Sequence, residues 1–303
     1  MNMIKLNRLL ATILLGGALA LPVPAAVAAG QQSFATPEAA MEAFGTAVID
    51  SDEGALQAMF GANFRQLFPP AGAELRYRFL EAWAKSHKIE PDGDTRARIA
   101  VGEKGWTLPI PLAKTASGWR FDMKAGKDEM AIRTIGRNEL SAIQVTKAYA
   151  DAQKEYFAMD RNGDGVPEYA QRIASSAGKT DGLYWPTQAA EEPSPLGRRL
   201  ADAAAEKGRK PGSYHGYSYR ILTAQGPDAP GGARSYIADG RMTGGFGLVA
   251  WPTSYAKTGV MTFMINQDGQ VYEKNLGPDT ATQAARVKTF NPDATWRKVA
   301  DNE

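Results

Sequence analysis

The residues of this chain whose types and spacing could do chemistry lie between positions 160 and 168, in the run Asp-Arg-Asn-Gly-Asp-Gly-Val-Pro-Glu. Side chains with oxygen atoms stand at alternate positions, and a glycine follows at the sixth, where a calcium-binding loop makes its sharp turn. Hard cations such as calcium prefer oxygen ligands of this kind. We therefore predict a calcium site whose ligands are Asp160, Asn162, Asp164, the carbonyl of Val166, and Glu168.

The loop differs from a standard EF-hand at its twelfth position, where Gln171 replaces the bidentate glutamate. The metal site could be completed by Glu168 or by a ligand from elsewhere in the chain. Alternatively, the segment is an Asp/Gly-rich turn that caps the preceding helix. Extracellular calcium modules bind at about 10⁻⁴–10⁻³ M, and calcium at ten times the Kd stabilises a fold by about 1.4 kcal/mol. A calcium ion bound here would therefore have a structural role.

A second arrangement has the residue types of a serine nucleophile. Ser176-Ala177-Gly178-Lys179 fits the S-x-x-K pattern, and Lys257-Thr258-Gly259 fits the K-T-G pattern, of penicillin-binding proteins and serine β-lactamases. However, only about 80 residues separate the two, and no Ser-x-Asn element lies between them. Such short patterns arise by chance, and the second is also typical of a turn before a strand. We therefore predict no catalytic residue and no cofactor-binding residue.

The first domain that we predict, residues 30–130, has helices followed by strands. Thr36 is an N-cap with proline at the first helical position, and Asp52 begins a short second helix. Helices followed by a meander are typical of an α+β domain. The Thr36-Pro37-Glu38 opening and the Gly118–Asp122 strand resemble the cone-shaped fold of the nuclear transport factor family, in which a curved sheet forms a pocket. The other predicted elements are a helix at 73–88 and strands at 96–101, 106–111 and 118–123.

The second predicted domain, residues 137–303, follows a break in the chain from Gly126 to Gly136. A long helix from Glu139 to Met159 runs into the acidic loop, because apolar residues recur there at three- and four-residue spacing. A short helical turn is predicted at 169–175. The periodicity then changes to two, and Asp268-Gly269 indicates a hairpin. The predicted strands are 217–221, 245–251, 259–266 and 270–274, which form an antiparallel sheet against the long helix.

The N-terminus has the pattern of a cleaved signal peptide, residues 1–29. Lys5 and Arg8 precede an apolar run of 13 residues, Leu9 to Leu21, and Ala26-Val27-Ala28 offers a small-x-small cleavage site. The run is shorter than the roughly 20 residues of a membrane span, although an uncleaved anchor is the alternative. We expect export to the periplasm or the cell exterior, and no membrane span after the signal is removed.

Composition excludes several classes of function. Without the two basic residues of the signal, the chain has 33 basic and 33 acidic residues. A neutral total argues against nucleic acid as a partner, because such proteins carry a concentrated positive field. The chain has no cysteine, so it has neither a thiolate nucleophile nor a disulfide. Its stability must come from its core and from any bound metal.

Several segments resemble the exported bacterial family known as domain of unknown function 2950. They include Arg137-Asn138-Glu139-Leu140, Ala150-Asp151-Ala152-Gln153, the acidic loop, Asp181-Gly182-Leu183-Tyr184-Trp185-Pro186, the segment 221–227 and Leu276-Gly277-Pro278-Asp279-Thr280. The resemblance covers nearly the whole chain after the signal and implies export. It implies no particular activity.

The second half is also similar to the globular heads of type IV pilins and pseudopilins, some of which carry a calcium loop. The resemblance rests on the long helix, the acidic loop, and the meander that contains Gly259–Phe263 and Asp268-Gly269. It implies a pilin-head-like packing of helix on sheet. The N-terminus departs from the pilin pattern, because it has an ordinary signal peptide in place of a short leader and a hydrophobic assembly helix.

From these features we expect an exported, non-enzymatic protein that binds or scaffolds in the cell envelope. Its partner would be an envelope protein or polymer, and calcium would be its cofactor. One alternative is a hydrolase or transferase that acts on envelope polymers, with a pocket in the first domain that Glu74, Glu81 and Asp122 could line. Another is an accessory factor of a pilus or secretion system.

Overall fold

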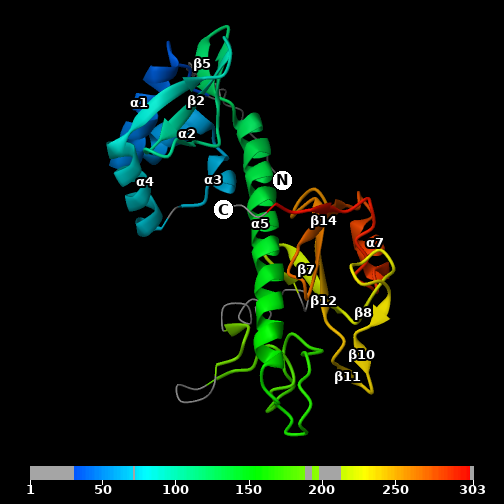
Figure 1. Ribbon diagram of the computed structural model, residues 1–303. Coiled ribbons are helices and arrows are strands. Elements are labelled where there is room, and N and C mark those ends of the chain that lie inside the picture. Colours follow the sequence, from blue (N-terminus) through cyan, green and yellow to red (C-terminus); the bar gives the residue numbers. More distant parts are fainter. Residues whose placement is uncertain (1–30, 71, 188–192, 198–212, 301–303) are drawn as a thin grey trace, which may run out of the picture. The chain divides into compact units, whose positions relative to one another are not determined.

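The computed structural model describes residues 31–70, 72–187, 193–197 and 213–300 (Figure 1). The predicted signal peptide lies outside the described residues. The chain divides into two compact units between Met123 and Lys124. Helices and antiparallel sheets occur in both, so the predicted α+β class is confirmed.

The N-terminal unit begins with helices whose ends follow from their capping residues. The side chain of Thr36 accepts a hydrogen bond from the N–H of Ala39 at 3.1 Å, and Asp52 accepts one from Ala55 at 2.9 Å. Each bond satisfies an N–H group that has no partner within the helix. Both predicted N-caps are therefore confirmed. The helices are α1 (Pro37–Asp50), α2 (Glu53–Phe60), α3 (Phe64–Leu67) and α4 (Ala73–Lys85).

An antiparallel sheet completes the N-terminal unit, with strand order β1-β2-β4-β5 and with β3 paired to β2. Phe44 of α1 packs edge-on against Phe60, Phe79 and Trp83, and Phe121 of β5 adds to the same core. The strand predicted at 96–101 is confirmed, whereas the first and fourth strands were not predicted. The strands are β1 (His87–Pro91), β2 (Arg96–Val101), β3 (Trp106–Thr107), β4 (Leu112–Thr115) and β5 (Gly118–Phe121).

Helix α5 (Met123–Phe157) is continuous over 35 residues, so the predicted break from Gly126 to Gly136 is wrong. A glycine inside a helix costs only about 1 kcal/mol relative to alanine, which neighbouring contacts offset. Ion pairs four residues apart join Lys124 to Asp128 at 3.0 Å and Glu129 to Arg133 at 2.8 Å across this stretch. Within the described residues, no helix is long and apolar enough to cross a membrane.

The C-terminal unit is built on an antiparallel sheet in the order β15-β14-β13-β12-β7-β6. The hairpin predicted at Asp268-Gly269 joins β13 to β14, where Gly269 has a φ of 80° that suits glycine. Two-stranded ribbons and a short helix, α7 (Thr280–Arg286), accompany the sheet. The sheet strands are β6 (Ser213–Tyr214), β7 (Tyr217–Leu222), β12 (Gly247–Pro252), β13 (Met261–Asn266), β14 (Tyr272–Asn275) and β15 (Arg297–Lys298).

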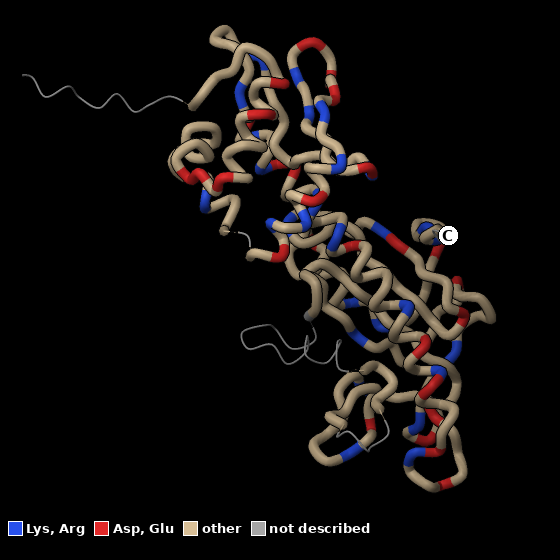
Figure 2. Tube along the Cα trace, turned by 90° about the vertical axis from the view of Figure 1, so that its left-hand side faces the viewer, with Lys and Arg blue, Asp and Glu red and all other residues tan. Residues whose placement is uncertain are grey.

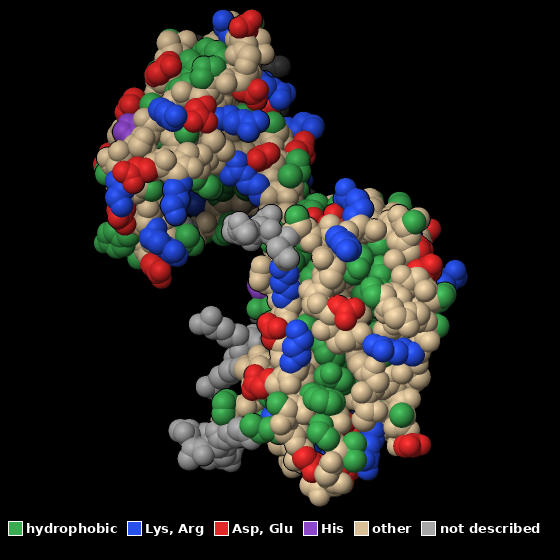
Figure 3. Space-filling view, in the orientation of Figure 1, with side chains coloured by type: hydrophobic (Ala, Val, Ile, Leu, Met, Phe, Trp, Pro, Cys, Tyr) green, Lys and Arg blue, Asp and Glu red, His purple; other side chains and the backbone are tan. Residues whose placement is uncertain are grey.

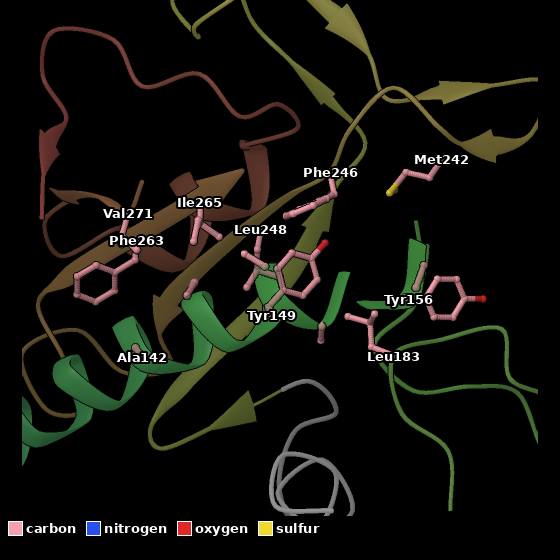
Figure 4. Close-up of a cluster of buried hydrophobic side chains, with 14 of the residues drawn as sticks. Ala142, Tyr149, Tyr156, Leu183, Met242, Phe246, Leu248, Phe263, Ile265 and Val271 are labelled. Atoms are coloured by element: carbon pink, nitrogen blue, oxygen red, sulfur yellow. The ribbon is translucent and has the colours of Figure 1, made fainter. Parts of the chain in front are cut away.

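Both faces of this sheet are covered, because alternate residues of β12 belong to different cores. Leu248 and Ala250 join the core on the α5 side, where Tyr149 of the helix points at the sheet (Figure 4). Val249 joins Met264 and Phe290 in a smaller core. Successive strand residues point to opposite faces, so β12 is apolar throughout.

The segment after the acidic loop is extended, and the helical turn predicted at 169–175 is wrong. The N–H of Tyr169 donates to the carbonyl of Met242 at 2.8 Å, and the N–H of Ser175 donates to the carbonyl of Tyr184 at 2.8 Å. Met242 belongs to β11 (Arg241–Met242), which pairs with β10 (Ile237–Ala238). These residues form long-range backbone bonds instead of the local bonds of a helix.

Acidic and basic residues are interspersed along the trace (Figure 2) and over the face drawn in Figure 3. This agrees with the formal net charge of only +2.

Candidate binding pocket and metal loop

Asp160 organises the predicted metal loop through backbone hydrogen bonds. Its Oδ1 accepts from the N–H of Gly163 at 2.9 Å, and its Oδ2 accepts from the N–H of Gly165 at 2.6 Å. These bonds, led by that from Gly165, lower the pKa of the Asp160 carboxyl from its ordinary value of 3.8. Both glycines have positive φ, 73° and 82°, which a residue with a side chain rarely adopts.

Asp164 is held by a cation from another part of the unit. Its Oδ2 lies 2.6 Å from Nη2 of Arg241 on β11, and its Oδ1 accepts from the N–H of Val166 at 3.0 Å. Asn162 accepts from the N–H of Asp164 at 3.1 Å and donates to Glu168 at 3.2 Å. The structure thus brings the predicted ligands into one exposed loop.

The oxygen atoms of this loop are engaged by hydrogen-bond donors and by a guanidinium. In the described ranges of the chain, no group of three or more His, Cys, Asp or Glu side chains is placed so that it could hold a metal ion. Calcium binding by the loop therefore stays a prediction. Asp164 is both a predicted calcium ligand and the ion-pair partner of Arg241.

The loop is anchored at both ends by buried contacts. The amide of Gln153 on α5 accepts from the N–H of Ala170 and donates to its carbonyl, both at 2.8 Å. The guanidinium of Arg161 lies 5.1 Å from the ring centre of Tyr156 and 4.9 Å from that of Trp185, a cation–π arrangement. The loop is therefore fixed to α5 independently of any metal.

The serine pattern has a structural explanation in the turn that follows. The hydroxyl of Ser176 donates to Asp181 at 2.9 Å and accepts from Arg172 at 2.8 Å. The same carboxylate accepts from the N–H of Ser176 at 2.7 Å, and these two bonds lower the pKa of Asp181. The Lys257-Thr258 pair lies in the turn between β12 and β13, where the N–H of Thr258 donates to the carbonyl of Ser254. Both patterns therefore belong to hydrogen-bonded turns.

A pocket of about 590 Å³ lies in the N-terminal unit. Helices α1, α2, α3 and α4 contribute to its wall, and the segment 106–110 completes it. All lining residues other than Ser51, Glu53, Arg65 and Arg76 are apolar. Leu75 and Trp106 line it while 59% and 49% exposed, so apolar surface continues from the pocket to the solvent.

Two arginines supply the positive charge of the pocket wall. Arg65 forms a bidentate ion pair with Glu53, with Nε 2.9 Å from Oε2 and Nη2 against Oε1. Arg76 donates from Nη2 to the carbonyl of Ile49 at 2.7 Å and to that of Val48 at 3.2 Å. Arg76 thereby caps the C-terminal end of α1, where carbonyl groups have no helical partner.

Sequence reasoning did not identify these lining residues. The carboxylates that it offered for a pocket in this domain, Glu74, Glu81 and Asp122, are not among the lining residues. Glu74 and Glu81 instead pair with Arg78 and Lys85 on the exposed side of α4. A local signal was present, because Phe60, Phe64 and Phe68 recur every four residues and Pro69-Pro70 follows. Aromatic residues at this spacing more often belong to a hydrophobic core, so the pattern does not single out a pocket.

Comparison with known proteins identifies a family and no activity. The model of the family described as protein of unknown function, DUF2950, matches residues 31–299. The chain therefore belongs to this family, as its sequence segments predicted. No curated protein and no solved structure matches the chain. The likeness to pilin heads accordingly has no support beyond the sequence pattern.

Proposed function

We propose that this member of the DUF2950 family is an exported, non-enzymatic protein that binds a small, largely apolar ligand in its N-terminal unit. The observation that carries the proposal is the apolar pocket of about 590 Å³. Small-molecule sites are concave, have volumes of about 300–1,000 Å³, and are lined mostly by apolar side chains with a few polar groups. Residues 31–123 match this description in volume and in lining.

The titratable groups of the pocket wall favour binding over catalysis. They are Glu53, Arg65 and Arg76, and the carboxylate of Glu53 is engaged by Arg65 through two hydrogen bonds. A general acid or base must exchange a proton near the working pH. A guanidinium stays protonated, so the two arginines are suited to hold charge and not to transfer protons.

In this proposal the C-terminal unit is the scaffold, and export rests on the predicted signal peptide. The sheet between its two cores and the anchored loop give it a rigid frame. Calcium in the loop at 160–168 would add stability in a chain without disulfides. The unit would contact an envelope protein or polymer in the periplasm or outside the cell.

The pocket proposal is tested with residues 30–303 and a neutral apolar fluorophore, N-phenyl-1-naphthylamine. Leu75→Glu places a charge in the exposed part of the pocket wall. Tyr77→Glu places the same charge on the same helix at a residue that is 71% exposed and does not line the pocket. We expect saturable binding that Leu75→Glu weakens at least tenfold and Tyr77→Glu leaves unchanged. Equal binding by both variants, or no saturable binding by the wild type, contradicts the proposal.

A further inference from the structure

We propose that the ligand is an amphiphile with one hydrocarbon chain and an anionic head, which is a carboxylate or a phosphate. The chain occupies the pocket of the N-terminal unit and the head lies at Arg76. This inference rests on the proposed function of the pocket as a ligand site. It adds the chemical class of the ligand and the direction in which the ligand lies.

The interior of the pocket has the chemistry of a hydrocarbon site. Phe44, Leu56, Phe60 and Ile110 line it, and each is at most 9% exposed. These side chains have neither donors nor acceptors, so a polar group buried against them would lose its hydrogen bonds to water without replacement. Each methylene buried there raises the affinity about fourfold. The interior therefore selects a chain without polar groups.

The polar residues of the wall are gathered at one place, the junction between α1 and α2. Ser51 is the C-cap of α1 and Glu53 is the first residue of α2. Arg76 bonds the last carbonyls of α1, and Arg65 pairs with Glu53. All four polar lining residues thus belong to a single junction. A wall that is apolar except at one junction matches a ligand that is apolar except at its head.

The charged residues that line the pocket at this junction carry a net positive charge. Glu53 is neutralised by Arg65, whereas the hydrogen-bond partners of Arg76 in the described chain are neutral carbonyls. The partial negative charge at the end of α1 and the partial positive charge at the start of α2 oppose each other. One formal positive charge remains among the lining residues, since Asp50 and Asp52 of the same junction are exposed and do not line the pocket. This charge favours an anionic head over a neutral or cationic one.

The guanidinium of Arg76 has donors left for such a head. Its Nε and Nη2 supply the bonds to Val48 and Ile49, and Nη1 carries two further N–H groups. Arginine binds carboxylate and phosphate oxygens through charge-assisted hydrogen bonds. The bonds to α1 also hold the guanidinium in place, so little freedom is lost when the head binds.

The experiment measures displacement of N-phenyl-1-naphthylamine from residues 30–303 by ligands that share a twelve-carbon chain. These are dodecanoate, dodecyl phosphate, dodecanol and dodecyltrimethylammonium, each below its micelle concentration. We expect one or both anions to bind at least tenfold more tightly than dodecanol, since bonds to a charged group contribute about that factor or more. The two anions identify the head. Decanoate, which is two methylenes shorter, should bind about fifteenfold more weakly than dodecanoate.

Variants locate the head. Arg76→Gln should weaken anion binding about tenfold and leave dodecanol binding unchanged, and Arg76→Lys should restore part of the loss. Unchanged dodecanol binding also shows that the variant is folded. Arg78→Gln is the matched control, because Arg78 lies on the same helix, pairs with Glu74, and does not line the pocket.

The experiment distinguishes failure of the anionic ligand class from failure of the proposed ligand site. If dodecanol and the ammonium bind as tightly as the anions, or if Arg76→Gln behaves as Arg78→Gln does, the anionic class is overturned while the pocket remains a ligand site. If neither the fluorophore nor any chain ligand binds saturably, the proposed function fails, and the inference fails with it.

Discussion

Arg241 holds Asp164 in an ion pair, with Nη2 2.6 Å from Oδ2. Arg241 comes from β11, and Asp164 comes from the loop that follows α5, so the pair closes the loop onto the β10–β11 ribbon. Gln171 makes a second connection, since its Nε2 donates to the carbonyl of Gly240 at 2.8 Å. A calcium ion that took this oxygen of Asp164 as a ligand would have to displace the guanidinium. Calcium affinity and the ion pair are therefore coupled.

Arg241→Gln should strengthen calcium binding by the loop. The substitution removes a competing cation from Asp164 while the backbone hydrogen bonds to Asp160 remain. Calcium at ten times the Kd of the variant should stabilise the variant by about 1.4 kcal/mol. For a unit of this size, this raises Tm by about 3–5 °C. Thermal melting in calcium, magnesium and EDTA measures the effect. Asp160→Ala is the control, and it should abolish the rise in Tm with calcium. A calcium response in Asp160→Ala equal to that of the wild type disproves the site.

Acid should remove the contribution of Asp160 to stability. Its folded pKa is lowered, chiefly by the hydrogen bond from Gly165. A lowered pKa stabilises the folded state above the unfolded pKa, and this contribution is lost as the pH falls through the folded value. In EDTA, the difference in unfolding free energy between wild type and Asp160→Asn should be constant near neutral pH and shrink below the ordinary value of 3.8. Urea unfolding across this range measures it, and a difference that does not change with pH contradicts the assignment.

Gln153→Leu should destabilise the C-terminal unit. Gln153 is fully buried, and its amide pairs with both the N–H and the carbonyl of Ala170. Leucine would leave these two groups unpaired in the core, at a cost of about 2–4 kcal/mol. Denaturant unfolding measures the loss. Gln144→Leu, at an exposed position of the same helix, should change stability by less than about 0.5 kcal/mol, and equal effects of the two changes would contradict the bridging role.

Gly45→Ala and Gly136→Ala should have opposite effects, although both replace a helical glycine by the better helix former. A Cβ at Gly45 would overlap the indole ring of Trp83, which is 6% exposed, so a loss of about 1–3 kcal/mol is expected. A Cβ at Gly136 meets no atom within 4 Å, so a gain of about 0.5–1 kcal/mol follows if α5 is continuous there. Denaturant unfolding of both variants measures the signs. A loss at Gly136 would indicate that the helix is interrupted.

Much of the local structure was predictable because its causes lie within a few residues. Thr36 and Asp52 cap helices through bonds to residues three positions away. The alternation of residues 217–221 marks β7, and Asp268-Gly269 marks the hairpin. The pattern of the acidic loop likewise placed Asp160, Asn162 and Asp164 together. The break at Gly126–Gly136 was wrong, because glycine is a weak local signal that ion pairs along α5 outweigh.

The sequence by itself determined the α+β class, the family, the small net charge and the position of the acidic loop. Only the tertiary structure decided that Arg241 pairs with Asp164, that Gln153 bridges to Ala170, and that segment 106–110 closes a pocket with four helices. The physical reason is the distance along the chain between the residues that interact. Caps, turns and periodicity depend on neighbours along the chain, whereas an ion pair or a pocket wall depends on which distant segments pack together, and a single sequence does not specify that packing locally.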